Sequence, residues 1–87
     1  MITFTIAPTI TPQSLYAALA SPIEGRTCRQ ILLQTPTANA GVINYGGHRN
    51  QPFRLAANAT QLLEETSPKN LWLFGNGTDT VHVGLIQ

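Results

Sequence analysis

Charge is scarce in this sequence of 87 residues, which has five lysines and arginines and four aspartates and glutamates. Charged residues make up 10% of the chain, whereas about a quarter is typical of a soluble domain. The formal net charge of +1 provides no basic field of the kind that holds phosphate backbones, so nucleic acid is not an expected partner. Because a weakly charged surface loses its water easily, this composition favours a protein that lives packed against other subunits.

Cysteine is nearly absent, since Cys28 is the only one. A single thiol excludes an intrachain disulfide and leaves too few sulfur ligands for a structural zinc site, so stability must come from apolar packing. Long hydrophobic runs are also missing, and no stretch has the length that a membrane span or a signal peptide needs. We therefore expect a protein made in the cytoplasm, with no membrane partner.

The first residues alternate between apolar and polar side chains. Ile2, Phe4 and Ile6 are separated by threonines, and this period of two is typical of a half-buried strand. Pro8 ends the pattern. Because a compact sandwich of 87 residues does not need this apolar edge, we expect an N-terminal arm that adds a strand to the sheet of a neighbouring subunit.

A helix signal follows the first strand. Thr11 provides a capping hydroxyl, Pro12 suits the first helical position, and the apolar residues after them share one helical face. This predicts one short helix near residues 12 to 20, ended by the proline and glycine of residues 21–25. We expect a single domain over residues 1–87, with an N-terminal arm and short helix over 1–27 and a β-sandwich over 28–87.

Six short apolar segments then alternate with stretches rich in Gly, Pro, Asn or Ser. The segments are 28–35, 42–45, 53–55, 60–63, 71–74 and 80–86. Strands at such spacing predict a mainly β protein, a single small antiparallel β-sandwich or barrel of about six to seven short strands. In the last segment the valines of residues 81 and 83 fall on one face, which fixes the register of that strand.

Few residues could support a reaction. His48 lies in a glycine-rich loop, and His82 lies on the second face of the last strand with Asp79 as the only acid nearby. A metal site or a general base needs several converging groups, so we expect surface or sheet-edge roles for both histidines. Cys28, at the start of a strand, is typical of a small buried hydrophobe. We expect no enzyme activity, and no catalytic, metal-binding or cofactor-binding residues.

Two features indicate contact with a partner. Arg49 and Arg54 bracket Phe53, and arginines beside an aromatic ring concentrate binding energy, although solvated loop arginines would have the same sequence. The strand that contains Trp72 is apolar on both faces, so it is either central in the fold or covered by a neighbouring subunit. We expect the interface to include the N-terminal residues, this arginine-flanked segment and the tryptophan: Ile2, Phe4, Ile6, Arg49, Phe53, Arg54 and Trp72.

The order of these segments has a counterpart in a known class of protein. An apolar strand ends in Gln34, an Asn-x-Gly turn begins at Asn39, the next strand ends in Gly46 and Gly47, and an aromatic strand precedes a glycine-rich hairpin. This pattern, over roughly residues 28 to 86, resembles the small β-sandwich virion proteins of tailed bacteriophages, of the capsid cement or decoration type. Residues 57–58 are Ala-Asn, where such proteins often carry Pro-Gly.

The resemblance implies a virion structural protein that binds and stabilises the lattice of the major capsid protein. It also implies self-association with closed symmetry, for which a homotrimer is the expected form, and it places the protein in the virion. The alternative is a neck, tail or receptor- or carbohydrate-binding β-module, in which Tyr45, His48 and Trp72 would line a shallow site marked by free aromatic rings at one end of the sheet. A small enzyme subunit is disfavoured because the four acids are scattered.

Overall fold

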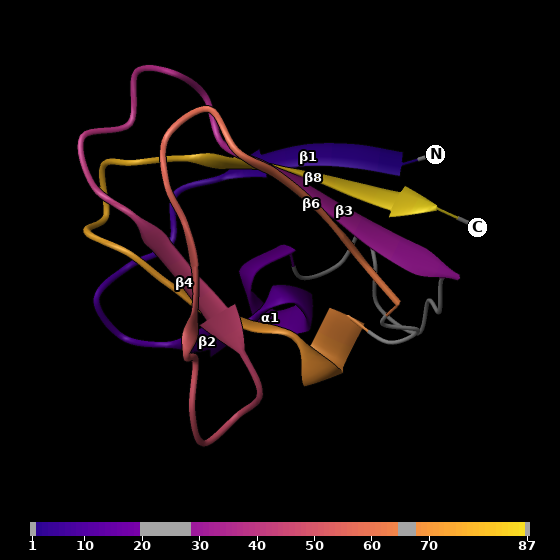
Figure 1. Ribbon diagram of the computed structural model, residues 1–87. Helices are drawn as coiled ribbons and strands as arrows, with labels where there is room; N and C mark the ends of the chain where they lie inside the picture. Colours follow the sequence, from indigo (N-terminus) through magenta and orange to yellow (C-terminus); the bar gives the residue numbers. More distant parts are fainter. Residues whose placement is uncertain (1, 20–28, 65–67, 87) are drawn as a thin grey trace.

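The protein is a β-sandwich of two four-stranded antiparallel sheets, as a computed structural model shows for residues 2–19, 29–64 and 68–86 (Figure 1). One sheet has the strand order β1-β8-β3-β6, and the other has the order β2-β7-β4-β5. The elements are β1 (Ile2–Ile6), β2 (Gln13–Ser14), α1 (Leu15–Leu19), β3 (Gln30–Gln34), β4 (Ile43–Gly46), β5 (Phe53–Leu55), β6 (Thr60–Leu63), η2 (Pro68–Asn70), β7 (Trp72–Phe74) and β8 (Val81–Ile86). The predicted mainly β class is confirmed, and the two separate sheets make the fold a sandwich.

Alternating side chains set the register of the β1-β8-β3-β6 sheet. In β8, Val81, Val83 and Leu85 are buried while His82 is exposed. Leu85 lies opposite Ile31 of β3 on one side and Ile2 of β1 on the other. A shift of one residue would turn the buried side chains of β8 outward, so the alternation holds the register.

The core lies between the two sheets. Leu15 of α1 closes it from one end, and the helix packs against η2. The buried apolar side chains come from both sheets and from α1: Leu15, Ile31, Leu33, Ile43, Tyr45, Leu55, Leu71, Leu73, Val81, Val83 and Leu85. Full burial of one such aliphatic side chain stabilises a fold by roughly 1.5–3 kcal/mol, so this set supplies the stability that disulfides would otherwise provide.

The expected helix near residues 12 to 20 does not form over that length. Residues 13 and 14 pair with β7 as the strand β2, and the helical conformation is confined to Leu15–Leu19. The backbone N–H of Ala17 donates to Ser14 Oγ at 3.0 Å, so Ser14, and not Thr11 as predicted, caps the helix. A helix this short has little stability of its own, and the residues before it gain ladder hydrogen bonds instead.

The expected N-terminal arm is a strand of the chain's own sandwich. β1 pairs with β8 along its whole length, and Phe4 and Ile6 are half-buried against the core. β2 likewise joins the other sheet, so the described residues 2–19 contribute a strand to each sheet rather than forming a separate arm. The physical reason is that β3 pairs with only one edge of β8, so β1 forms the hydrogen bonds of the other edge while Phe4 and Ile6 pack on the core. Among the described residues, one edge of β1 has no partner strand.

The hydroxyl group of Thr35 connects two loops by hydrogen bonds. Thr35, which is 1% exposed, donates its hydroxyl hydrogen to the carbonyl of Ala56 at 2.5 Å and accepts the N–H of Ala59 at 2.9 Å. These bonds tie the β5–β6 connection to the end of β3. Asn58 in that connection has a φ of 59°, a left-handed conformation that Asn tolerates better than most residues.

A second network joins the β3–β4 loop to the β7–β8 loop. Asp79 is 6% exposed and accepts the N–H groups of Ala40 and Gly41 at 2.9 and 2.7 Å. Asn76 donates its side-chain amide to Asp79 at 3.0 Å. The backbone hydrogen bonds from Ala40 and Gly41 hold the pKa of Asp79 below its ordinary value, against the opposing effect of burial.

Candidate functional site

The β4–β5 hairpin forms one end of the molecule. Tyr45 of β4 lies opposite Phe53 of β5, and the two ring centroids are 5.4 Å apart. Tyr45 is buried, whereas Phe53 is 58% exposed. The turn between the strands is tight at Gly46, where an added Cβ would lie 2.6 Å from the carbonyl oxygen of Asn50. Only glycine fits there, and its small size brings the hairpin loop close to β4.

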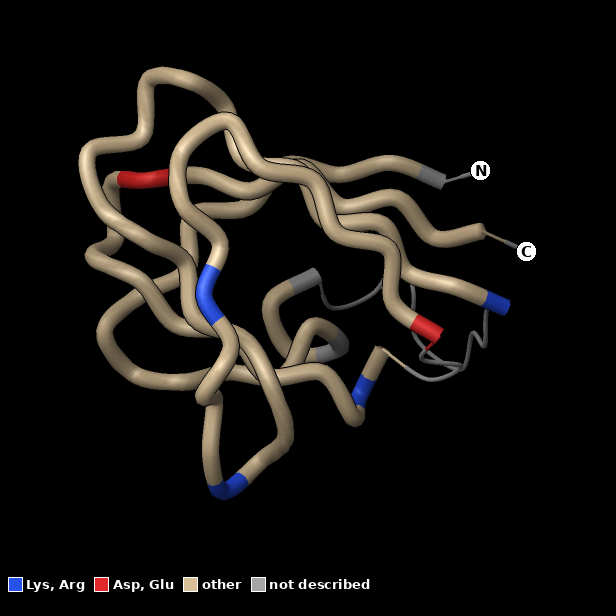
Figure 2. Tube along the Cα trace, viewed as in Figure 1, with Lys and Arg blue, Asp and Glu red and all other residues tan. Residues whose placement is uncertain are grey.

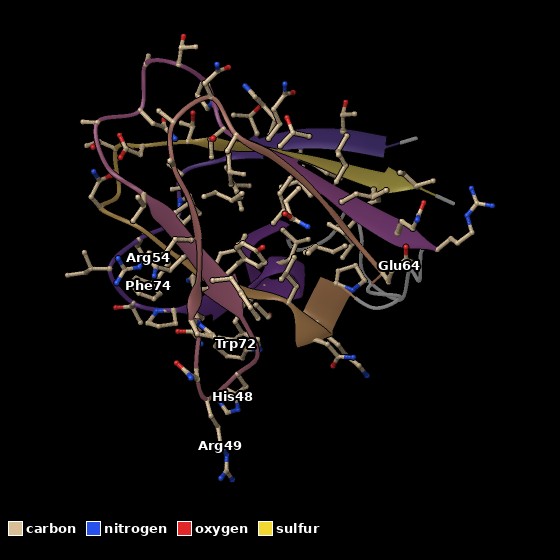
Figure 3. The ribbon with its side chains drawn as sticks, viewed as in Figure 1. His48, Arg49, Arg54, Glu64, Trp72 and Phe74 are labelled. Carbon is tan, nitrogen blue, oxygen red and sulfur yellow. The ribbon has the colours of Figure 1, made fainter. Side chains whose placement is uncertain are left out.

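His48 turns back from this loop onto the sheet. Its ring and that of Trp72 have centroids 4.4 Å apart and planes inclined at 34°. Trp72 lies opposite Gly46 in the register of β4 and β7, on the outer face of the sheet. Figure 3 shows the two side chains together at the base of the hairpin, with Arg49 at its tip.

Two shallow hollows lie beside these rings. One holds about 300 Å³ and is lined by His48, Lys69, Asn70 and Trp72. The second holds about 350 Å³ and lies between β4, β5 and the end of β6, where it is lined by Tyr45, Gly46, Gly47, Phe53, Leu63, Glu64, Asn70 and Leu71. Asn70 lines both, but Trp72 lies on the outer face of the sheet and Tyr45 on its buried face, so the two hollows are separate. We call the first hollow the aromatic groove.

Positive charge gathers around the aromatic groove. Arg49 and Arg54 belong to the β4–β5 hairpin and Lys69 to η2, and all three are exposed. Figure 2 shows these basic segments at the hairpin end of the molecule. The remaining cation in the described part of the chain, Arg29, precedes β3 in the other sheet. Glu64, which borders the second hollow, accepts a hydrogen bond from Gln30 Nε2 at 3.0 Å.

The outer face of the β2-β7-β4-β5 sheet carries further basic and aromatic side chains. Arg54 and Phe74 lie on either side of Asn44 in the register, so both fall on this face with Trp72 further along β7. Figure 3 shows Arg54, Phe74, Trp72 and His48 following one another along it. Trp72 and Phe74 are half-buried and β7 is central in its sheet, which is one of the two arrangements expected for this strand.

The seven residues predicted to form an interface therefore separate into two groups. Arg49, Phe53, Arg54 and Trp72 come together on the hairpin and its sheet. The β1 residues lie in the other sheet; Phe4 and Ile6 face the core, and the side chain of Ile2 lies outside the described residues. The sequence missed Lys69 and Asn70, which join the site only because η2 places them beside Trp72. No local signal in the sequence could have shown this.

The other candidate residues lie away from the groove. His82 is on the outer face of the β1-β8-β3-β6 sheet, where Nδ1 forms a 2.8 Å hydrogen bond with Thr5 Oγ1. Asp79 is occupied by the loop network. Cys28 lies outside the described residues. Among residues 2–19, 29–64 and 68–86 no group of three or more His, Cys, Asp or Glu side chains could hold a metal ion.

Comparisons of the chain with protein-family models, with curated proteins and with solved structures find no match. In the described part of the chain, no helix has the length and apolar character needed to cross a membrane.

Proposed function

We propose that this protein is a virion structural protein of the capsid cement or decoration type, which binds the lattice of a major capsid protein. The observation that carries the proposal is the β4–β5 hairpin, which has three exposed side chains suited to binding, Arg49 in its loop and Phe53 and Arg54 in β5. Phe53 can fill an apolar pocket of the partner, and Arg49 and Arg54 can each form a two-pronged, charge-assisted pair with a carboxylate.

The composition supports the same proposal. With 10% charged residues, most of the surface is neutral, and such a surface is covered by a partner at a low cost in lost hydration. Large apolar side chains remain exposed at Ile10 (80%), Val42 (42%) and Leu62 (45%) as well as at Phe53. Exposed apolar side chains of this kind suit a protein that attaches to other subunits. The proposed function is binding and includes no catalysed reaction.

The test is decoration of capsids by the purified protein. Changing Arg49 and Arg54 to alanine is expected to weaken binding at least about tenfold, because each charged pair contributes on the order of 1 kcal/mol. The same loss should appear in the unmodified protein as salt rises above about 0.15 M, since these charges are exposed and screened. Co-sedimentation of protein with capsid particles measures both effects.

Arg29→Ala is the matched control, because it removes an exposed cation from the other sheet and should leave binding unchanged. Far-ultraviolet circular dichroism of each variant establishes that the sandwich is intact. Normal decoration by the double arginine variant would contradict the proposal.

A further inference from the structure

The strand β1 is the longest of the edge strands that the structure describes. It has five residues, whereas the other edge strands β6, β5 and β2 have four, three and two. Figure 1 shows β1 at the outer edge of its sheet, beside β8. Natural proteins protect such edges with charged residues, prolines, bulges or short strands. β1 has no charged residue or proline, and its register with β8 is continuous, so this edge is open to a further strand.

The sequence of β1 reads the same in both directions, as Ile2-Thr3-Phe4-Thr5-Ile6. When two copies of this strand pair antiparallel with Phe4 at the centre, isoleucine lies opposite isoleucine, threonine opposite threonine and phenylalanine opposite phenylalanine. Pairs of β-branched side chains, of threonines and of aromatic rings all stabilise antiparallel sheets. The strand is therefore complementary to a second copy of itself.

We propose that the free edge of β1 binds β1 of a second copy of this chain. The two strands run antiparallel with a twofold axis at Phe4, and two four-stranded sheets become one sheet of eight strands. Thr3 and Thr5 are exposed, while Phe4 and Ile6 pack on the core. Pairing centred on Phe4 keeps these two faces continuous across the axis. A shift of one residue would place Phe4 opposite a threonine, so the alternation fixes the register.

Charge does not oppose this contact. The five residues of β1 are uncharged, and each copy has a formal net charge of only +1, so two copies repel each other weakly. Thr5 Oγ1 shares a 2.8 Å hydrogen bond with His82 Nδ1 of the neighbouring strand β8. An uncharged edge offers no ion pair that would select a different protein, whereas the matched side-chain pairs select a second copy.

The contact is small, and it closes after two copies. A stable interface has about 20–30 residues on each side, whereas β1 contributes five. We therefore expect a dissociation constant on the order of 0.1 mM. An antiparallel pair has twofold symmetry, so this contact is separate from any threefold contact of the expected homotrimer.

Sedimentation equilibrium of the purified full chain, without capsid, measures the pairing. Between about 10 µM and about 1 mM the average mass should nearly double, whatever species is present at the lower concentration. Thr3→Lys should weaken the association at least about tenfold, because it places two lysines beside the twofold axis. Thr60→Lys is the matched control, since Thr60 is an exposed residue of β6 at the other edge of the same sheet. This variant should associate like the unmodified protein, and circular dichroism should show an intact fold for both variants.

Disulfide cross-linking tests the register. Thr3 would lie opposite Thr5 of the second copy at a Cα distance of about 4.5–5.5 Å, which a disulfide can span. The two copies of Thr3 would lie about 7–8 Å apart, which is too far. Thr3→Cys and Thr5→Cys are each combined with Cys28→Ser, which removes the only native thiol. With oxidised glutathione, a mixture of the two variants should form a covalent dimer, and neither variant should do so alone.

Three results would overturn the proposal. One is an average mass that stays constant up to about 1 mM. Another is equal association of Thr3→Lys and Thr60→Lys. The third is cross-linking of either cysteine variant alone as efficiently as the mixture. If the chain does not pair with itself but Thr3→Lys abolishes the decoration of capsids, the edge binds a strand of the capsid protein and not a second copy. Because the sedimentation and cross-linking samples contain no capsid, the pairing and the proposed function can fail independently.

Discussion

Asp79 holds two loops together at one end of the sandwich. Its two carboxylate oxygens accept separate backbone N–H groups from the β3–β4 loop, and the side chain comes from the β7–β8 loop. Asn39 completes the connection with a pair of hydrogen bonds to the backbone of Thr80, at 2.8 and 3.0 Å. The sequence offered Asp79 as a partner for His82, but the structure gives its oxygens to backbone donors.

Replacing Asp79 with asparagine is expected to lower the melting temperature at neutral pH. An amide has one acceptor oxygen where the carboxylate has two, so one of the two backbone N–H groups loses its partner. Glu64→Gln is the control, because Glu64 is an exposed carboxylate at the end of β6. Thermal unfolding followed by circular dichroism measures both changes.

The contribution of Asp79 should also depend on pH. Its pKa is lower in the folded state than the ordinary value of about 3.9. Its stabilisation is therefore complete above about pH 4 and is lost as pH falls through the lower, folded-state pKa. The difference in melting temperature between the unmodified protein and Asp79→Asn should narrow below about pH 4. A constant difference between pH 7 and pH 2 would contradict this role.

Gly46 and Gly47 are adjacent but have opposite surroundings. A Cβ on Gly46 would lie 2.6 to 2.9 Å from atoms of Asn50, Pro52 and Gln51, whereas a Cβ on Gly47 would have no atom within 4 Å. Gly46→Ala is therefore expected to destabilise the fold by about 1–3 kcal/mol, the usual result of crowding a packed site. Gly47→Ala should stay within about 0.5 kcal/mol. Urea unfolding of the two variants measures the difference, and equal losses would show that the hairpin loop moves freely.

At the scale of the element, β1 is the strand whose role changed most between sequence and structure. Its pairing with β8 and the packing of Phe4 and Ile6 on the core make it part of the fold. The carbonyls of Pro8 and Thr9, just after β1, also accept the N–H groups of Gly77 and Gly75 at 2.9 Å each. The beginning of the chain thus supports both the β8 strand and the β7–β8 loop.

Deleting residues 1–10 is therefore expected to abolish the cooperative unfolding transition of the sandwich. The deletion uncovers one side of the central strand β8 and leaves two backbone N–H groups without their partners. Thr3→Lys places a charge on the exposed face of β1 and discourages the pairing of its free edge with another chain. This variant should leave the unfolding transition intact. A truncated protein that still unfolds cooperatively, at an unchanged urea midpoint, would show that β1 is a dispensable arm.

The strands could be predicted from the sequence because each is a short apolar run between turn residues. The segments near 30, 43, 53, 60, 72 and 81 all became strands, and the alternation in β8 matches its burial. The failures have one cause, since the partner strand of β1 and the conformation of β2 and α1 depend on residues far away in the chain. Gln13 pairs with Leu73 and β1 with β8, and such pairings across the chain leave no local signal.

The candidate site was predictable to the same degree. Arg49, Phe53, Arg54 and Trp72 were identified from residue type, because arginine and aromatic side chains are unusual in so uncharged a chain. Lys69 and Asn70 were not, because a turn of 3₁₀ helix brings them beside Trp72. Their contribution depends on how the η2 segment packs on α1, and this is a property of the folded protein.

For the whole molecule, the exposed apolar residues favour self-association. Phe53 is 58% exposed on the hairpin and Leu62 is 45% exposed on β6, an edge strand of the other sheet. Sedimentation velocity at micromolar concentration is expected to show a species larger than the 9.4 kDa chain, with a trimer as the expected size. Leu62→Lys should shift the species toward the monomer. A 9.4 kDa species alone, in the absence of capsid, would contradict self-association.

The strand order also fixes when this protein can fold during its synthesis. β8 is translated after the other described strands, yet it is central in its sheet, between β1 and β3 (Figure 1). Residues 2 and 85 are direct partners, so β1 cannot form its ladder hydrogen bonds until β8 has been synthesised. Contacts between such distant residues form slowly because closing the long loop costs entropy. Until β8 has been synthesised, β1 lacks its partner strand and β3 can pair along one edge only, with β6.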